Sequence, residues 1–213
     1  MRCYKTQQNP FSCDLKIKMG LLDLEKHFAF YGSYHSNPKN IIIHILFVWP
    51  ILFTALVHLY FTPPLFHCYV LNFINPILIF NLGFVFAVVY GLFYAALDIK
   101  AGSFAAVLTF LCWVGASFVA KSIGYELAWK VVLATQLFCW AGQIFGHYVF
   151  EKRAPALLDN IAQAFLMAPF FVVLEILQSS IGYEPYPGFQ RKVQARIDAN
   201  IKEWKNKQQK KIS

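Results

Sequence analysis

The sequence predicts an all-α membrane protein: a polytopic helix bundle with four spans, a proline-broken re-entrant helical hairpin, and both termini in the cytosol. Of its 213 residues, 58% are hydrophobic and 14% are charged, which is too apolar for a soluble domain of this length. Four apolar segments approach the roughly 20 residues that a helix needs to cross a bilayer. They cover residues 41–61, 77–97, 103–120 and 128–149.

The basic residues set the expected topology. Six of them precede the first segment and eight lie after residue 190, whereas residues 62–76, the first connection, contain no lysine or arginine. Because basic segments stay on the cytosolic side of a membrane, this pattern places both termini in the cytosol. The net charge of +8 suits contact with an anionic lipid surface and requires no nucleic-acid partner.

Ahead of the first span, residues 1–18 are polar and lack the apolar stretch and cleavage site of a secretory signal. We expect a flexible leader there, with translation beginning at Met1 or Met19, one membrane bundle over residues 19–185, and a basic cytosolic tail over residues 186–213. The five cysteines are scattered without a close pair, which argues against a disulfide framework or a thiolate metal site.

The region before the first span predicts a surface helix. Residues 20–34 carry apolar side chains three or four positions apart with charges between them, the pattern of an amphipathic helix on the cytosolic face of a membrane. A turn at residues 36–38 ends this helix. The first span follows, with a kink expected at Pro50 and a stop at the proline pair 63–64.

The second span returns to a short cytosolic turn near Asp98, the third runs outward, and the fourth comes back. In the fourth, Gly142 and Gly146 have the spacing that lets a neighbouring helix approach closely. The next apolar region, 157–181, is interrupted by Pro169. A full fifth span would put the basic tail on the lumenal side, so a hairpin of two half-helices is expected. A polar, frayed helix is expected from residue 190.

Three histidines far apart in sequence are expected at one depth and in one leaflet. His35 and His44 lie at the start of the first span, and His147 lies in the last turn of the fourth. Since packed helices lie about 8–10 Å apart, inward-facing imidazoles at these positions can share one metal ion. His58 lies about 21 Å further along the helix than His44 and belongs with His67 on the opposite side.

Two further residues adjoin this histidine set. Glu151 follows His147 by four residues on the same helical face, where its carboxylate can ligate a metal, orient an imidazole or pair with a neighbouring cation. Asn40 precedes His44 by four residues, where it can orient that histidine or cap the first span, and the cap is preferred. Because imidazoles predominate and thiolates are absent, iron, zinc or copper fits better than calcium or magnesium.

Several residues at this depth are candidates for contact with a substrate. Lys39, Lys152 and Arg153 can neutralise a carboxylate or anchor the helix ends in the headgroup region. Tyr31 is as compatible with an interfacial aromatic belt as with substrate contact. Glu175 lies in an apolar setting within the expected hairpin, and the sequence alone gives it no role.

Two sequence blocks carry a family resemblance. The stretch FYGSYHSNPKN over residues 30–40, continuing to His44, resembles the signature of the 2-hydroxy fatty acid dioxygenase family, as does GHYVFEKRAPAL over residues 146–157. The resemblance implies an endoplasmic reticulum membrane enzyme that uses ferrous iron and molecular oxygen to shorten 2-hydroxy fatty acids by one carbon. In that family the reaction is part of fatty acid alpha-oxidation in phytosphingosine degradation.

The resemblance also implies the site residues. The histidines that match the family pattern are His35, His44 and His147. The resemblance implies that these three are the catalytic iron ligands. Some family members have a second histidine directly after the first, where this chain has Ser36. His27 or Glu151 is therefore a candidate to complete the ligands of Fe2+.

The expected function is an iron(II)-dependent dioxygenase whose acyl substrate lies among aromatic side chains of the bundle. From the residues alone, two alternatives stay open: a haem-binding membrane protein with two histidines as axial ligands, and a non-enzymatic lipid transporter or scaffold. The last residues, 210–213, resemble a cytosolic dilysine retrieval signal, which agrees with the endoplasmic reticulum membrane.

Overall fold

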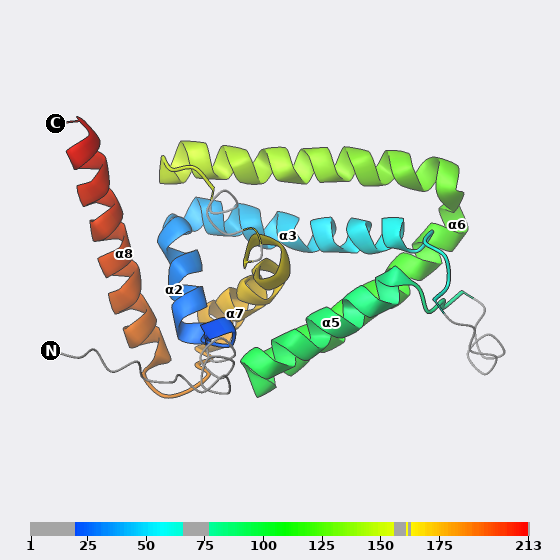
Figure 1. The fold of residues 1–213 in the computed structure, drawn as a ribbon, viewed down its shortest axis with the longest axis horizontal. Helices are drawn as coiled ribbons and strands as arrows, with labels where there is room; N and C mark the ends of the chain where they lie inside the picture. The colour runs from blue at the N-terminus through cyan, green and yellow to red at the C-terminus, as the bar shows by residue number, and fades with distance from the viewer. Residues whose placement is uncertain (1–19, 66–76, 156–160, 162, 213) are drawn as a thin grey trace, which may run out of the picture.

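Every secondary-structure element in the described part of the chain is a helix. The computed structural model describes residues 20–65, 77–155, 161 and 163–212 (Figure 1). Its elements are α2 (Leu24–Tyr34), α3 (Pro38–Leu59), α5 (Leu82–Leu97), α6 (Ile99–Gly146), η1 (His147–Glu151), η3 (Gln163–Met167), α7 (Ala168–Ile181) and α8 (Phe189–Ile212). The elements η1 and η3 are single π-helical turns. The all-α prediction is confirmed for these residues.

Some predicted features lie outside the described residues. They are the leader 1–18, both possible start methionines, most of the first connection, the first arm of the hairpin at 157–160, and the residues Cys3, Cys13, Cys68 and His67.

Among the described residues, three helices are long and apolar enough to cross a membrane: Pro38–Leu59, Ile99–Glu151 and Gln163–Ile181. The second of these has 53 residues, about 80 Å at the helical rise, more than twice the ~30 Å hydrocarbon core of a bilayer. It bends at Gly124, whose φ of 69° is non-helical. The segments predicted at 103–120 and 128–149 lie on either side of this bend.

The second predicted span is shorter than expected. α5 begins at Leu82 instead of residue 77 and has 16 residues. The reason is Asn81, whose side chain accepts a hydrogen bond from the Phe84 amide at 3.2 Å and donates one to the Tyr60 carbonyl at 2.8 Å. An asparagine that caps a helix in this way fixes its first residue.

The start of α3 corrects a second prediction. The residue that caps it is Asn37, whose side-chain oxygen accepts from the Lys39 amide at 3.0 Å, with Pro38 as the first helical residue. Asn40, expected to be the cap, is fully buried inside the first turn. Its amide instead donates to Glu151 at 3.1 Å, because the close packing of α6 brings that carboxylate over the helix.

The close approach predicted for Gly142 and Gly146 is confirmed. A Cβ at Gly142 would lie 2.2 Å from the Phe47 ring, and one at Gly146 would lie 2.4 Å from the Asn40 side-chain oxygen. Only glycine leaves room for α3 at these two positions, and α3 and α6 pack along one another (Figure 1). The pair therefore sets the distance between the helices that carry His44 and His147.

The region around Pro169 differs from the predicted hairpin. η3 runs directly into α7, and Pro169 lies in the first turn of α7. The Phe165 carbonyl, four residues before the proline that has no amide hydrogen, accepts a hydrogen bond from the Tyr90 hydroxyl at 3.0 Å. The chain therefore stays helical through the proline, which does not break it into two half-helices. Six consecutive residues of α7, from 169 to 174, are buried, and the side chains of Phe170, Phe171 and Leu174 are fully enclosed.

The tail is an ordered helix that packs on α2 (Figure 1). Phe189 is fully buried, and its ring lies 6.0 Å from that of Phe28. Burial of a phenylalanine side chain contributes about 1.5–3 kcal/mol. The expectation of a frayed helix is wrong for this first half of α8, because sequence polarity did not show the apolar stripe that starts at Phe189.

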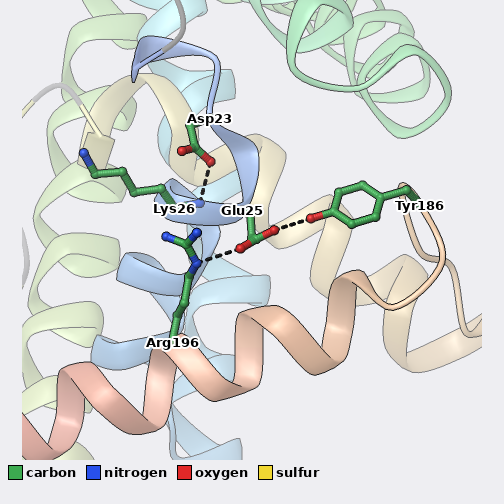
Figure 2. A network of polar contacts seen from close by, with 5 residues as sticks. All are labelled: Asp23, Glu25, Lys26, Tyr186 and Arg196. Atoms are coloured by element: carbon green, nitrogen blue, oxygen red, sulfur yellow. Dashed lines mark hydrogen bonds and ion pairs between the residues drawn. The ribbon is translucent and has the colours of Figure 1, made fainter.

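Polar contacts add to this packing (Figure 2). Glu25 on α2 pairs with Arg196 at 2.6 Å and accepts a hydrogen bond from the Tyr186 hydroxyl, while Asp23 caps α2 at the Lys26 amide. Arg196 is 52% exposed, so this ion pair contributes little stability compared with the buried phenylalanine. Together these contacts fasten α8 to the helix that leads into His35.

Candidate metal centre

Three histidines from three parts of the chain meet in the interior. His35 lies in the turn after α2, His44 in the second turn of α3, and His147 at the end of α6; they are 7%, 4% and 3% exposed. Their ring centroids are 4.3, 4.8 and 4.9 Å apart. One nitrogen from each ring lies within 4.8 Å of the others. The predicted convergence is confirmed.

The backbone fixes how two of the rings face the cluster. The Nδ1 atoms of His35 and His44 lie 2.8 Å from the Tyr31 carbonyl and 3.0 Å from the Asn40 carbonyl. Because a carbonyl only accepts, each Nδ1 must carry the proton, which leaves each Nε2 with a free lone pair. Metal-binding histidines are oriented by such an outer hydrogen bond.

The donor set fits a metal ion. His35 Nε2 and His147 Nδ1 are buried without a hydrogen-bond partner among the described residues. Buried polar atoms are almost always paired, so lone pairs left free at one point indicate a missing ligand. Burial, and then the nearby His44 and His147, lower the pKa of His35 well below 6.5. Its imidazole is therefore neutral at physiological pH, the form that binds a metal.

Glu151 ties the end of α6 to the turn between α2 and α3. Its carboxylate accepts hydrogen bonds from the Ser36 hydroxyl at 2.7 Å, the Asn37 amide at 2.8 Å and the Asn40 side chain at 3.1 Å. In the described chain, the group of residues close enough to share a metal contains the three histidines and not Glu151. Its contacts are those of a residue that positions the ligands.

The other two described histidines, His27 and His58, lie elsewhere. His27 has its Nε2 2.8 Å from the Gly20 carbonyl and its Nδ1 3.4 Å from the Gln163 amide, away from the cluster. His58 is exposed near the far end of α3, apart from His44 as predicted. Neither is placed to complete the ligand set.

Tyr31 is part of the site. Its ring stacks on His35 with centroids 4.0 Å apart and planes 20° apart, and its buried hydroxyl has no partner in the described structure. Burial, followed by the charges of Glu175 and Glu151, raises the pKa of Tyr31 well above 10. The hydroxyl keeps its proton at physiological pH and is available as a donor.

The basic residues near the cluster have structural contacts. The Arg153 guanidinium lies 3.4 Å from the Tyr34 ring centroid and 5.0 Å from that of Trp204, and it donates to the Ser33 carbonyl at 3.3 Å. It thereby links the end of α6 to α2 and α8. The Lys39 ammonium lies 5.5 Å from the Phe150 ring. These contacts lie within the protein, and they test neither of the two roles expected from the sequence, charge neutralisation or anchoring in the headgroup region.

Two adjoining cavities open beside the histidines. The smaller, about 60 Å³, is lined by the three histidines and Tyr31. The larger, about 430 Å³, is lined by mostly apolar side chains of α3, α5, α6, η3 and α7, including Val48 and Leu59. Four residues line both cavities: Trp140, Gln143, Ala164 and Ala168. The two cavities therefore adjoin at these four residues.

Sequence reasoning missed Gln143 and Trp140. Gln143 precedes His147 by one helical turn, on the same face of α6, which was the available signal. A glutamine in an apolar span is uncommon, and here its amide lies between the two cavities. Only the rotation of α6 relative to α3 and α7 shows that it faces the site.

Comparison with known proteins agrees with this arrangement. The family model described as 2-hydroxy-palmitic acid dioxygenase Mpo1-like matches residues 21–180. The chain is 35% identical over 166 residues to the 2-hydroxy-palmitic acid dioxygenase MPO1 of Saccharomyces cerevisiae, across 78% of this chain and 86% of the relative. No solved structure matches it. The match to the family model includes all three clustered histidines, and the chain belongs to the 2-hydroxy-palmitic acid dioxygenase Mpo1-like family.

Proposed function

We propose that the protein is an iron(II)-dependent dioxygenase that shortens 2-hydroxy fatty acids by one carbon. The observation that carries this proposal is the meeting of three buried imidazoles, with unpaired nitrogens, beside a mostly apolar cavity. The yeast relative is named as a dioxygenase of 2-hydroxy-palmitic acid. Family membership, the metal-capable histidine cluster and the large apolar cavity all support this dioxygenase activity.

The metal follows from the reaction class. Three imidazoles suit iron, zinc or copper, and zinc has no redox chemistry. A metal that takes part in oxygenation must exchange electrons, which leaves iron and copper. The family resemblance implies ferrous iron, and we propose that His35, His44 and His147 hold it. When bound, it supplies the electron transfer that lets molecular oxygen react with an organic acid. We propose that Glu151 holds the turn that presents His35 and His44.

The cavities divide the substrate into two parts. Along α3 the larger cavity extends from Val48 to Leu59, about 16 Å at the helical rise. That matches the ~15 Å that one layer of acyl chains fills in a bilayer. Each methylene buried there contributes about 0.8 kcal/mol. The chain then orients the acid so that its 2-hydroxyl and carboxylate reach the histidines, while the apolar walls exclude water.

The proposed setting is the endoplasmic reticulum membrane, with several crossings and both termini cytosolic. The bend at Gly124 supports two crossings by α6, and the start of α3 and the end of α6 lie at one end of the bundle beside α2 and α8 (Figure 1). That end carries the basic tail and the histidines. Part of the fatty acid alpha-oxidation of phytosphingosine degradation would then take place just beneath the cytosolic headgroups.

Metal replacement tests the proposed function. Protein purified without oxygen is expected to contain about one iron per chain and to convert 2-hydroxypalmitate and oxygen to the acid one carbon shorter, measured by mass spectrometry. Removal of iron with a chelator should abolish turnover, ferrous iron should restore it, and zinc should occupy the site without restoring it. Turnover that survives complete removal of the metal would contradict the proposal.

Different observations bear on the two alternative functions, haem binding and lipid transport. The cavity at the histidines is about 60 Å³, far below the roughly 300 Å³ or more that a drug-sized ligand requires, which disfavours haem. The large apolar cavity favours a lipid carrier as the second candidate. Transfer of 2-hydroxypalmitate between vesicles by metal-free protein, without any turnover by iron-loaded protein, would indicate the carrier.

A further inference from the structure

Two hydrogen-bond donors at the histidine cluster are buried without a partner. They are the Tyr31 hydroxyl and the Gln143 side-chain nitrogen; the two residues are 5% and 8% exposed, and both line the small cavity. Elsewhere in the described residues, the Tyr94 hydroxyl and the Gln178 amide are also buried and unpaired. Those two line neither cavity.

An unpaired buried donor lowers the stability of a folded protein, because the group has lost its hydrogen bonds to water. Two such donors at one cavity indicate that a ligand supplies their acceptors. The ligand must offer acceptor atoms, since a tyrosine hydroxyl and an amide nitrogen both carry hydrogens to donate.

The positions of the two donors show which part of a substrate they meet. Tyr31 stacks on His35, and Gln143 lies one helical turn before His147. Gln143 also lines the large apolar cavity. A fatty acid whose chain fills that cavity would therefore place its first carbons, and its carboxylate, between these donors and the histidines.

We propose that Tyr31 and Gln143 bind the carboxylate of the acid substrate, each by one hydrogen bond from its side chain. This inference rests on the proposed function. A carboxylate has two oxygens with about four acceptor sites, so it can meet both donors and a metal ion together. Hydrogen bonds to a charged acceptor are about twice as strong as those between neutral groups. The two residues would make the enzyme prefer a free acid to an ester.

The test uses single-group replacements with matched controls. Tyr31→Phe removes one hydroxyl, and Gln143→Met removes the amide at similar volume; Tyr94→Phe and Gln178→Met make the same changes away from the cavities. Binding of 2-hydroxypalmitate to metal-free, full-length protein in lipid nanodiscs is measured at equilibrium. Each site variant should bind about 10- to 100-fold more weakly, the loss of one charge-assisted hydrogen bond. Both controls should bind within about twofold of wild type.

Two further readouts separate binding from folding. All four variants should keep their iron content and melt no lower than wild type, because replacing an unpaired buried donor by an apolar group removes a destabilising feature. Palmitate has the carboxylate but no 2-hydroxyl, so its affinity should fall by the same factor in Tyr31→Phe and Gln143→Met. A loss confined to 2-hydroxypalmitate would show that the donors contact the hydroxyl, and would overturn the assignment to the carboxylate.

Unchanged affinity in both site variants would also overturn the inference, since the donors would then hold only water. Failure of the proposed function has a different signature: iron-loaded wild-type protein would not shorten 2-hydroxypalmitate. The binding measurement requires no metal and no turnover, so the two failures are told apart in the same set of samples.

Discussion

The two ends of α3 each carry a histidine, and the two histidines lie in different surroundings. His44 is 4% exposed, is held by the Asn40 carbonyl and faces two other imidazoles. His58 is exposed and lies at the end of the large apolar cavity. Between them, the helix supplies the apolar wall of that cavity, including Val48 and Leu52.

The difference shows that a histidine by itself does not form a metal-capable site. At the His44 end, α2 and α6 bring His35, His147 and the Glu151 tie against α3. At the His58 end, the described residues form no group of side chains that could share a metal ion. One end carries the metal-capable cluster and the other lines the large apolar cavity, so each can be altered separately.

The largest expected effect comes from the histidines of the cluster. Alanine at His35, His44 or His147 should lower iron affinity by more than about 100-fold, beyond the 10- to 100-fold that loss of an outer hydrogen-bond partner costs. Turnover of 2-hydroxypalmitate should fall below detection. Iron content and product are measured on the same preparations. His58→Ala is the control on the same helix, and iron loss in that variant would remove the contrast between the two ends.

Glu151→Ala should have the next largest effect. Without its carboxylate, the Ser36, Asn37 and Asn40 donors lose their shared acceptor and the turn before α3 loosens. Iron affinity, measured by competition with a chelator, is expected to fall about 10- to 100-fold. The exposed Glu126 on the same long helix provides the control, as Glu126→Ala. A loss as large as that of the histidine variants would identify Glu151 as a ligand.

Filling the large apolar cavity should change which acyl-chain length the enzyme prefers and should leave its iron content unchanged. Ala55 lines the large cavity, and Ala55→Phe would take the space of two or more methylenes worth about 0.8 kcal/mol each. The kcat/KM for 2-hydroxypalmitate should fall about tenfold relative to an acid several carbons shorter. Val107→Phe, at a 58% exposed position of α6, is the control. An unchanged ratio would place the acyl chain elsewhere.

The smallest effect is a pH dependence of the metal-free protein. The pKa of His35 is lowered by burial and by the other two histidines, so below pH ~6.5 the unfolded chain binds a proton that the folded chain does not. Stability should then fall as pH drops below about 6.5, by at most ~1.4 kcal/mol per pH unit from this residue. Denaturation midpoints between pH 7.5 and 5.5 measure it. His35→Ala should have a shallower slope, and an equal slope would assign the effect to other groups.

Much of the fold and of the candidate site could be predicted from local patterns. Hydropathy located the apolar segments, and the glycine spacing at 142 and 146 indicated the tight contact of α3 with α6 that the structure has. The depth of His35, His44 and His147 followed from counting residues along helices, because the helical rise is constant. The family resemblance agreed with these positions.

Other features depended on contacts that no local pattern contains. Asn40 reads as a helix cap, yet its partner Glu151 is 111 residues away. The tail reads as a polar helix, yet Phe189 is buried against Phe28 of α2. Pro169 reads as a helix break, yet the helix continues through it, and the Phe165 carbonyl accepts instead from Tyr90 of α5. In each case a distant segment decided the environment.

The sequence by itself determined that the chain is helical and strongly apolar, and that three histidines lie at one depth. These are properties of residue order along an axis. The tertiary structure alone decided which nitrogens are free, that Glu151 ties the turn, and that Tyr31 and Gln143 carry unpaired donors beside the small cavity. Those properties depend on how each helix is rotated about its axis, and that rotation is set by the packing of side chains from distant segments.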